Sequence, residues 1–519
     1  MKTAVFLLLA CSVLTTRGDE VTSDVVVYGA TAGGVTAAVA AARQGAKVVL
    51  IEPGHHVGGM LSGGLGHSDV VGQQNLIGGL CLEVYQRIAK HYGESDPKKA
   101  FDFEPHVAEQ VLDGLLRETG VRVVFGQRVE SVTKRGASIV ALKTDTGASY
   151  VARVFLDASY EGDLMAKAHV RYAVGREGRA QYGEWLAGRT ELLPGHHQFK
   201  YAVSPWRDGK LLPFITPQEK LAPTGEGDGK FQSYCFRLCL TDRPENRIPI
   251  AKPDHYNPDD YELARRCIQS GGGVSLGIAR VPNGKCDANS GGPVSSNLLG
   301  ASWEYPEAGP QRRREIWEQH LRWAHGLVWF LQNDPVVPEQ QRARMRQWGL
   351  CKDEFQDTGG WPHQLYIREG RRMLGESVVT QHDLEEHRTK PDSIGMGGYN
   401  IDIREVQWVS VRTFLFPKAA DRVYVEGYVS QPVQPWQIPY SALLPRRAEC
   451  DNLLVAVCPS MSTVAYASFR MEPGYMIAGH ASGLAAALAG KDNVAVQQVS
   501  VAKLQRLLRE QGQVLEVAP

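Results

Sequence analysis

Residues 24–52 constrain the fold more than any other part of the chain, because they read as a strand, a glycine-rich turn, a helix and a second strand. The segment Asp24–Tyr28 is a short β-branched run, which is typical of a buried parallel strand. An alanine-rich helix is expected over about Gly33–Gln44, where Gly45 ends it, and Lys47–Ile51 reads as the next strand. This βαβ unit predicts an α/β fold built on a parallel sheet.

The turn between the first strand and the helix has the composition of a phosphate-binding loop. Gly29 permits a tight turn, and Gly34 lets the helix pack closely on the strand, so that free amides and the helix dipole face a pyrophosphate. Glu52 follows Gly29 by twenty-three residues, where an acid accepts hydrogen bonds from an adenosine ribose. Thr31 stands where the strict fingerprint has its second glycine, and a tight turn without a ligand is the alternative. The residues expected to bind a dinucleotide are Gly29, Ala30, Thr31, Ala32, Gly33, Gly34 and Glu52.

A second glycine-dense segment, residues 53–67, follows the second strand and favours a flavin. A nicotinamide-binding domain usually continues to another helix, whereas a loop rich in glycine lets the backbone approach a long flat ligand. Residues 52–60 resemble the E-x-x-x-x-x-G-G-M element of two-dinucleotide-binding flavoproteins. The resemblance implies that FAD is the cofactor and that Pro53, Gly59 and Met60 lie at its pyrophosphate and flavin.

Segments further along the chain extend this resemblance. Residues 123–132 and 138–144 read as strands of a small meander, which in such proteins supplies a backbone contact to adenine near Val129. Residues 151–158 read as a buried strand, and the turn after it resembles the D-A-T/S-x-x-G-D-L element at the adenosine end of FAD. The resemblance adds Ala158, Ser159 and Glu161 to the expected FAD contacts.

The carboxyl-terminal part reads as the return of the chain to the same domain. Residues 452–456 are expected to form the final strand, and an Ala/Gly-rich helix is expected over about Gly474–Leu488. Pro473 suits the first turn of that helix. Amides at its amino end would meet the flavin pyrimidine edge, where negative charge builds up on reduction. Met471, Glu472 and Pro473 are therefore expected at the cofactor.

As a whole, residues 24–514 resemble the secreted or periplasmic FAD-dependent oxidoreductases, a family some of whose members are mislabelled as xanthan lyases. The signatures that carry the likeness are I-R-E-G-R-R-M at 367–373, D-S-I-G-M-G at 392–397 and R-M-E-P at 470–473. The family implies a Rossmann-like FAD-binding domain, with a parallel sheet and a small β-meander, and an inserted mixed α+β substrate or cap domain. Thr463 lies where relatives often carry a histidine, which puts any acid/base role at that position in doubt.

Five segments follow from this reading. We expect a signal peptide over residues 1–18, the first part of the FAD-binding domain over 19–166, the cap over 167–365, the return segment with the second part of the FAD-binding domain over 366–490, and a helical tail over 491–519. Within the cap, the periodicity of apolar residues predicts a helix over Gln311–Gln332. The polar cluster Lys285–Asn289 reads as a solvated turn, with a substrate contact as the alternative.

The amino end has the pattern of a secretory leader. Lys2 precedes an apolar run at 4–14, and the small residues Thr16 and Gly18 lie near a cleavage position. The run is too short to span a bilayer, and no other stretch is apolar enough. We expect a secreted or periplasmic protein without an integral membrane segment. Cys11 leaves a lipoprotein cleavage site open as an alternative.

The charge balance and the cysteine spacing exclude several classes of protein and site. The chain has 57 basic and 57 acidic side chains, so it lacks the positive charge that binds nucleic acid. None of the cysteines forms a C-x-x-C, which removes support for zinc ribbons and thioredoxin-like sites, and no metal is expected. Buried free thiols are the default for the mature chain, although export leaves one or two disulfides possible. The mature chain would keep Cys81, Cys235, Cys239, Cys267, Cys286, Cys351, Cys450 and Cys458.

Two histidines are candidates for the base that hydride transfer to a flavin requires. His67 lies just beyond the glycine-rich flavin loop, where it could take a proton or hold the flavin covalently. A loop histidine bonded to backbone is the alternative for His67. His382, ten residues after Arg372, is the second candidate.

The I-R-E-G-R-R-M segment adds fixed positive charge. Arg368 and Arg372 could bind a carboxylate substrate or the reduced flavin, unless they belong to a buried ion-pair network with Glu369 and Glu376. Tyr399 is a weaker candidate proton donor.

These observations together predict an exported FAD enzyme that oxidises a C–OH or C–N bond of a small polar, carbohydrate-like molecule. No second dinucleotide fingerprint is present, so electrons are expected to leave to oxygen, a quinone or a redox protein. A flavin-dependent reductase of an enone or ketone with an external electron donor is one alternative. A non-catalytic binding module that retains the flavoprotein fold is another.

Overall fold

The computed structural model describes residues 20–517, apart from positions 71, 72, 194, 196, 387, 416 and 417. The expected leader, residues 1–18, and its lipoprotein alternative at Cys11 therefore lie outside the described residues.

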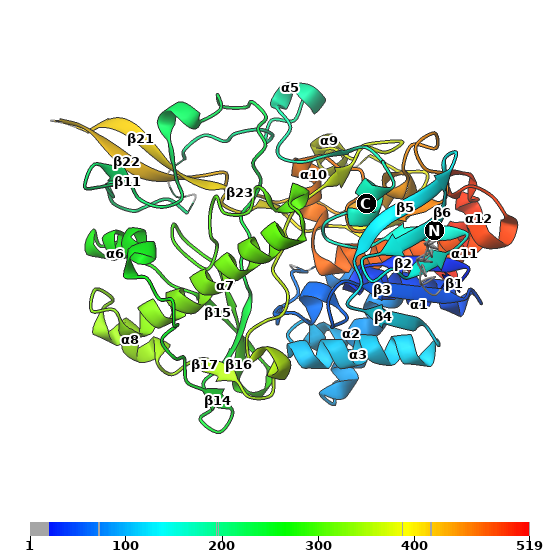
Figure 1. The fold of residues 1–519 in the computed structure, drawn as a ribbon, viewed down its shortest axis with the longest axis horizontal. Helices are drawn as coiled ribbons and strands as arrows, with labels where there is room; N and C mark the ends of the chain where they lie inside the picture. Colours follow the sequence, from blue (N-terminus) through cyan, green and yellow to red (C-terminus); the bar gives the residue numbers. More distant parts are fainter. Residues whose placement is uncertain are drawn as a thin grey trace, which may run out of the picture.

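A five-stranded parallel sheet forms the centre of the domain at the right of Figure 1. In spatial order its strands are β25 (Leu453–Val455), β8 (Val154–Asp157), β2 (Val25–Tyr28), β3 (Val48–Glu52) and β4 (Arg122–Phe125). Of these strands, β2 comes first in the chain and lies at the centre, and β25 comes last and lies at an edge. The predicted parallel-sheet fold is thereby confirmed.

Side chains of this sheet alternate between two cores, as the period of two in a strand requires. Val25 and Val27 belong to the larger core, which includes α1 (Ala32–Arg43) and α11 (Glu472–Asp492). Val26 and Tyr28 belong to a second core shared with a meander on the opposite face. The meander sheet consists of β5 (Val129–Arg135), β6 (Ser138–Thr144), β7 (Ser149–Val151) and, parallel to β7, β1 (Glu20–Thr22).

The expectation that all of residues 123–132 belong to the meander is wrong in its first part. Residues 122–125 form β4, which pairs in parallel with β3. Gly126 then turns the chain with a φ of 67°, so the meander begins only at Val129.

Helices α1 and α11 are in backbone contact because small residues face each other. A Cβ on Gly479 would lie 2.0 Å from the carbonyl oxygen of Gly33, and one on Gly483 would lie 2.1 Å from that of Ala37. Thr36 Oγ1 also donates to the carbonyl of Met476 at 3.0 Å. The first and last parts of the chain thus build one layer of the same domain.

Further helices surround these layers (Figure 1). They are α2 (Gly79–His91), α3 (Pro105–Glu118), α4 (Asp163–Lys167), α9 (Gln381–Glu385), α10 (Thr463–Phe469) and α12 (Val501–Glu510). Short strand pairs join the return segment to the rest: β18 (Arg372–Met373) with β9 (Tyr172–Ala173), β19 (Ser393–Gly397) with β24 (Trp436–Pro439), and β20 (Ile401–Ile403) with β23 (Val429–Gln431).

The cap occupies the left half of Figure 1 and is built on an antiparallel sheet. In spatial order its strands are β14 (Arg247–Ile248), β17 (Gly349–Cys351), β13 (Leu238–Thr241), β16 (Lys285–Asn289) and β15 (Gly277–Val281). Its helices are α5 (Arg179–Tyr182), α6 (Glu262–Gln269), α7 (Pro310–Asn333) and α8 (Glu339–Met345). Helix α7 matches the helix predicted over Gln311–Gln332.

The return segment re-enters the cap through a long hairpin. Strands β21 (Gln407–Leu415) and β22 (Lys418–Glu426) pair with each other, and β21 pairs in parallel with β12 (Ile215–Pro217). A separate short hairpin joins β10 (Trp206–Arg207) to β11 (Lys210–Leu211). The hairpin of β21 and β22 projects at the upper left of Figure 1.

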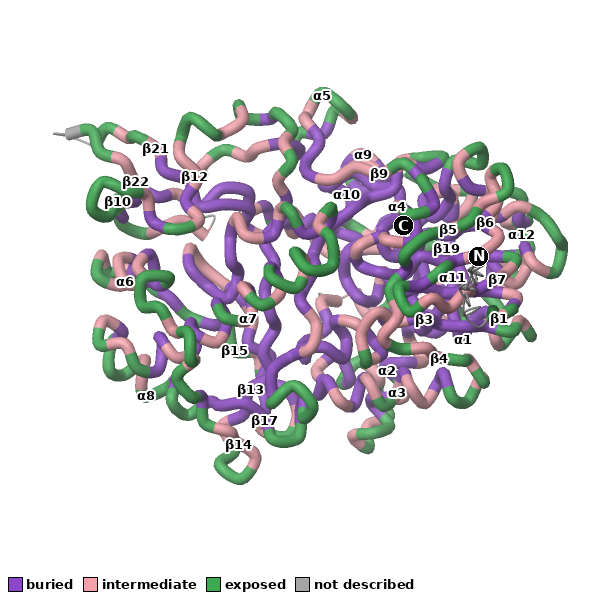
Figure 2. Tube along the Cα trace, viewed as in Figure 1, coloured by how far each residue is buried: buried purple, intermediate pink, exposed green. Residues whose placement is uncertain are grey.

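Buried residues follow the parallel sheet, α11 and the centre of the cap, whereas exposed residues gather on outer helices and loops (Figure 2). Within the described ranges, every helix is too short or too polar to cross a bilayer.

Candidate functional site

The turn after β2 presents the amino end of α1. Gly29 has a φ of 96°, and a Cβ there would lie 2.7 Å from the backbone nitrogen of Ser159. Thr31 caps the helix, because its Oγ1 accepts from the amide of Gly34 at 3.1 Å and donates to the carbonyl of Ala158 at 2.8 Å. Thr31, which stands in place of the second glycine, therefore joins the turn after β2 to the turn after β8 by a hydrogen bond. Among the described residues, the buried amide of Gly33 has no hydrogen-bond partner, which leaves it for an anion.

Glu52, at the end of β3, lies beside this helix start. Its Oε2 accepts from the amide of Ala30 and its Oε1 from the amide of Gly54, both at 2.6 Å. Burial raises the pKa of Glu52 to about 7, and the two amide hydrogen bonds act in the opposite direction. Pro53 follows it half-buried. The carboxylate is thus held in one orientation with lone pairs left for a ribose.

Tyr160 joins three segments predicted at the cofactor. Its hydroxyl accepts from the amide of Met60 at 2.8 Å and donates to Glu472 Oε1 at 2.6 Å. It also fills the space beside Gly59, where a Cβ would lie 2.4 Å from the hydroxyl oxygen. The sequence interpretation did not single out Tyr160, although it lies inside the D-A-S-Y-E-G-D-L turn.

Glu472 is the first residue of α11 and is buried. Its Oε2 has no hydrogen-bond partner among the described residues. Burial raises the pKa of Glu472 to about 8, with the hydrogen bond from Tyr160 acting against that shift. A neutral carboxyl group is therefore the main form of Glu472 at neutral pH.

Three other predicted FAD contacts are held by protein partners. The amide of Val129 donates to the hydroxyl of Tyr28 at 3.2 Å. Ser159 Oγ donates to Asp157 Oδ1 at 2.7 Å, and Glu161 Oε1 accepts from the hydroxyl of Tyr305 at 3.2 Å. These contacts order the adenosine side of the site, and direct binding of FAD by the three residues stays a prediction.

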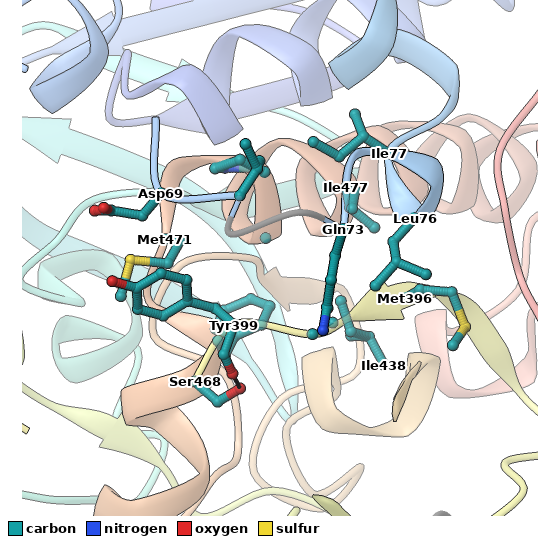
Figure 3. Close-up of a pocket in the computed structure, with 16 residues that line it drawn as sticks. Asp69, Gln73, Leu76, Ile77, Met396, Tyr399, Ile438, Ser468, Met471 and Ile477 are labelled. Atoms are coloured by element: carbon teal, nitrogen blue, oxygen red, sulfur yellow. Dashed lines mark hydrogen bonds between the residues drawn. The ribbon is translucent and has the colours of Figure 1, made fainter. Parts of the chain in front are cut away.

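A small pocket lies at the amino end of α11 (Figure 3). Met471, Pro473 and Gly474 line it together with Asp69 and Tyr399. In Figure 3 the carboxylate of Asp69 and the ring of Tyr399 lie at the same end as Met471, and the rest of the pocket is lined by aliphatic side chains together with Gln73. The pocket therefore combines a mostly apolar lining with a few polar groups, as small-molecule sites commonly do.

Asp69 is the carboxylate in this pocket. It is half-buried, and none of the described residues makes a hydrogen bond or ion pair to it. Burial raises the pKa of Asp69, whereas the nearby positive charges of Arg237 and His67 lower it. An unpaired carboxylate with a raised pKa can take a proton from a bound molecule. Sequence reasoning missed Asp69, although it lies only two residues from His67.

Arg470 brings positive charge to the same region. Its Nη1 donates to the hydroxyl of Tyr366 at 3.0 Å and its Nη2 to Asp402 Oδ2 at 2.9 Å, and its buried Nε has no partner among the described residues. The guanidinium of Arg368 lies 4.4 Å from the ring centre of Tyr366, on its face. Tyr366 is thus placed between two fixed positive charges.

The structure places His67 beside the pocket but not in its wall. His67 Nδ1 lies 2.5 Å from Asp102 Oδ1, and this contact raises the pKa of the imidazole. Its backbone amide donates to Asp287 Oδ2 at 3.2 Å. The side chain is 44% exposed. The role of His67 as base or tether stays a prediction.

The polar cluster at 285–289 is not the solvated turn that the sequence suggested. It forms the buried strand β16, because its charges have buried partners. Asp287 accepts from Arg237 Nε at 2.7 Å and from the backbone amide of Gly66 at 2.9 Å, so it anchors the end of the flavin loop. The Nζ of Lys285 lies 2.6 Å from Glu104 and 2.7 Å from Glu354.

That lysine bears on a possible metal site. Glu104, His106 and Glu354 are the only described histidine, cysteine or acidic residues that lie close enough together to hold a cation. The ammonium group of Lys285 is already paired with both glutamates, and His106 is paired with Glu354, so the cluster is an internal ion-pair network.

The remaining predicted catalytic residues lie elsewhere. His382 is half-exposed on α9, with Nε2 3.2 Å from the carbonyl of Tyr182, and it does not line the pocket. Arg372 is fully buried and pairs with Glu177 at 2.6 Å and with Glu369. The ion-pair alternative is therefore the observed arrangement for Arg372, with Glu177 in place of the expected Glu376.

Arg368 differs from its neighbours in the motif. It is buried, yet no described carboxylate lies within ion-pair distance of it. Its Nη1 donates to the carbonyl of Ser233 at 2.5 Å and its Nη2 to the sulfur of Cys235 at 3.2 Å. Thr463 donates to Glu369 Oε1 at 2.6 Å, so it acts within the same buried network.

A parallel sheet, an open helix start, an acid at the end of the second strand and a second helix start beside a glycine loop define a flavoprotein with a Rossmann-like FAD-binding domain. The chain belongs to the FAD dependent oxidoreductase family, whose sequence model matches residues 24–508.

Solved structures with partial similarity include three further proteins. The L-proline dehydrogenase from P. horikoshii is 15% identical, with 30% of this chain and 58% of that chain covered and a TM-score of 0.23. The 3-ketosteroid-delta4-(5alpha)-dehydrogenase from Rhodococcus jostii RHA1 is 18% identical, with 30% and 50% covered and a TM-score of 0.20. This chain thus spans less than two thirds of either. A geranylgeranyl bacteriochlorophyll reductase-like protein from Thermoplasma acidophilum is 12% identical, with 95% and 85% covered and a TM-score of 0.35.

Proposed function

We propose that this FAD-dependent oxidoreductase oxidises a C–OH or C–N bond of a small polar substrate. The observation that carries the proposal is the unpaired carboxylate of Asp69 at the polar end of a pocket beside the start of α11. Removal of hydride from an alcohol or amine carbon is helped by a base that takes the proton on oxygen or nitrogen. A carboxylate with no internal partner is free to take it.

FAD, when bound, accepts the hydride. The residues suited to hold it are the open turn at Gly33, the oriented carboxylate of Glu52 and the start of α11 at Glu472 and Gly474. The amide of Gly474 has no partner among the described residues, so this helix end can stabilise negative charge. Each of these groups belongs to a rigid element, which keeps the site pre-organised.

The protein groups around the pocket have separate roles. Asp69 takes the proton from the substrate, and Tyr399 lies at the same end of the pocket to donate a hydrogen bond. Arg470 and Tyr366 hold a fixed positive charge close by. The aliphatic end of the pocket excludes water from the reacting carbon. A compact, polar substrate with one oxidisable carbon fits this arrangement.

We also propose that the enzyme acts outside the cytoplasm. The leader pattern in residues 1–18 supports export, and export would separate the enzyme from the NAD(P)H pool. Electrons would then pass to oxygen, a quinone or a redox protein.

Anaerobic titration of the yellow holoprotein tests the proposed reaction. Sugars, sugar acids, other hydroxy acids and amines are added singly, and absorbance near 450 nm is followed. A substrate of the proposed class bleaches the flavin, and its oxidised product appears in equal amount. A reductase would instead be re-oxidised by an enone or ketone after chemical reduction, and a binding module would shift the spectrum without bleaching. Either of those outcomes, with no bleaching by any alcohol or amine, would overturn the proposal.

A further inference from the structure

We propose that Cys239 and Cys351 are a disulfide-forming pair that cross-links the cap sheet. Their sulfur atoms lie 3.9 Å apart, and both side chains are buried. All eight cysteines of the expected mature chain lie in the described ranges, and within those ranges this is the only pair whose sulfur atoms lie within 4 Å of each other. The inference concerns a covalent modification of the cap and does not depend on the substrate.

The two strands bring these thiols directly opposite each other. β13 and β17 are antiparallel neighbours, with Leu240 opposite Leu350. The same register places Cys239 opposite Cys351. Opposite residues in antiparallel strands have Cα atoms about 4.5–5.5 Å apart, which lies inside the range of about 4.4–6.8 Å found in disulfides. Rotation of the two side chains is therefore sufficient to bring the sulfurs to bonding distance.

The surroundings favour this pair over the other cysteines. Cys239 and Cys351 form a small apolar cluster with Phe355, and the thiol of Cys351 also donates to the backbone carbonyl of Cys239 at 3.6 Å. By contrast, the sulfur of Cys235 accepts from Arg368, and that of Cys458 donates to the carbonyl of Ser159 at 3.4 Å, rather than meeting another sulfur.

The bond forms by thiol–disulfide exchange with a small-molecule disulfide such as oxidised glutathione. One protein thiolate attacks the disulfide and releases one reduced thiol, and the second protein thiolate then displaces the other. The two cysteines lose two protons and two electrons, and one disulfide is reduced to two thiols. The hydrogen bond with Cys351 and burial raise the pKa of Cys239 well above its ordinary value, so exchange takes place while the cap is folding or transiently open.

The cross-link would reinforce the support of the flavin loop. β13 follows Arg237, which holds Asp287 and through it the amide of Gly66. β17 precedes Glu354, which accepts from the amide of His106 at 3.0 Å. The bond would tie these two anchoring segments together across a separation of 112 residues.

Peptide mapping of the full-length holoprotein tests the pair. Reduced protein is equilibrated with increasing ratios of oxidised to reduced glutathione, quenched in acid, alkylated and digested. We expect the peptides that contain Cys239 and Cys351 to appear as one linked species, with loss of two free thiols per chain. We also expect a melting temperature about 3–10 °C above that of the reduced form.

Variants separate this pair from chance oxidation. C239S and C351S should each lose the linked species and the rise in melting temperature, whereas the matched control C267S should keep both. Flavin absorbance checks that each variant folds. If a variant does not fold, the peptide mapping of unaltered protein still tests the linkage. Failure to find the 239–351 linkage at excess oxidised glutathione, or equal yields of other pairings, would overturn the inference.

Discussion

At the scale of single residues, the site depends on groups whose hydrogen-bonding capacity is incompletely used. Asp69 has no partner among the described residues, Glu472 has one free carboxyl oxygen, and Glu52 is held by two amides with lone pairs to spare. Buried polar atoms are usually satisfied, so such groups mark positions where a ligand completes the set. Each of the three leads to a measurable expectation.

Asp69→Asn should slow the reductive half-reaction by about 10²–10⁴, the usual contribution of a positioned base. The rate with unaltered protein should rise with pH as the Asp69 carboxyl ionises, and the variant should lose that limb. Stopped-flow absorbance under anaerobic conditions measures both. His67→Ala is the comparison, because its imidazole pairs with Asp102 outside the pocket wall. A larger loss of rate in the His67 variant than in the Asp69 variant would indicate that His67 is the base.

Glu52→Ala should weaken FAD binding by about ten- to a hundredfold. The carboxylate is expected to make charge-assisted hydrogen bonds to the adenosine ribose, and their loss would cost about 1.5–3 kcal/mol. Fluorescence titration of FAD-free protein at pH 8, where Glu52 is ionised, gives the affinity. Glu130, exposed on β5, provides the matched control as Glu130→Ala, which should bind FAD normally. Equal affinities in the two variants would contradict the assigned role.

Glu472 should make the stability of FAD-free protein depend on pH. Its pKa is about 8 in the folded state and lies near 4.5 when it is exposed, so folding retains a proton that the unfolded chain releases between these values. The stability that this group contributes is present below about pH 4.5 and is lost as pH rises through 8. Glu472→Gln keeps a neutral group, so its melting temperature should fall less than that of unaltered protein between pH 5 and 9. Parallel curves for the two proteins would show that Glu472 is already ionised.

At the scale of elements, backbone contact between α1 and α11 sets the geometry of both helix starts. Because Gly479 and Gly483 lie against carbonyl oxygens of α1, the two amino ends are held side by side facing the cofactor region. A change in the distance between these helices would displace the groups that bind phosphate and those that meet the flavin.

Gly483→Ala should therefore lower the melting temperature by several degrees and reduce FAD content. The added carbon would lie 2.1 Å from the carbonyl oxygen of Ala37, and overpacking of this kind costs about 1–3 kcal/mol. Gly490 lies in the same helix with no atom closer than 4.0 Å to such a carbon, so Gly490→Ala should be neutral or stabilising. Differential scanning calorimetry and the ratio of flavin to protein absorbance report the outcome. An unchanged Gly483 variant would contradict close packing.

How well each element could be predicted depends on whether its partners are near in sequence. The βαβ unit was predictable, because β-branched runs and glycines act locally, and helix α1 begins one residue from its expected start. Strand β16 was not predictable from the sequence. Its charged residues Lys285 and Asp287 can be buried because they pair with Glu104 and Arg237, and both partners lie far away in the chain. Asp69 was missed because the absence of a partner has no sequence signature. The pairing of β21 with β12 joins Trp408 to Ile215, a separation that no local pattern encodes.

At the scale of the whole molecule, the FAD-binding domain and the cap are stabilised in different ways. The FAD-binding domain joins strands and helices from both ends of the chain, whereas the cap contains buried ion pairs such as Arg176 with Glu426 and Asp228. The return segment contributes to both, since it carries α11 of the FAD-binding domain and the hairpin of β21 and β22 in the cap.

The proposal of export gives one expectation at this scale. Mature protein should begin near Asp19 and be recovered outside the cytoplasm, because residues 1–18 have the pattern of a cleaved leader. Amino-terminal sequencing and intact mass of protein from a cell fractionation settle the start. A Met1 start on cytosolic protein would remove the proposal, and a lipid on Cys11 would change it to membrane anchoring.

The contact between Thr36 and Met476 joins residues 440 positions apart, and it has a consequence for biosynthesis. A ribosome that adds roughly 5–20 residues per second needs about 20–90 s to travel from one to the other. During that interval the amino-terminal βαβ unit is complete in sequence but lacks the helix that closes its FAD site. Cofactor loading must therefore wait until translation is almost finished, and a stop codon before α11 would release a chain that carries every amino-terminal FAD motif and yet has no site in which to retain the cofactor.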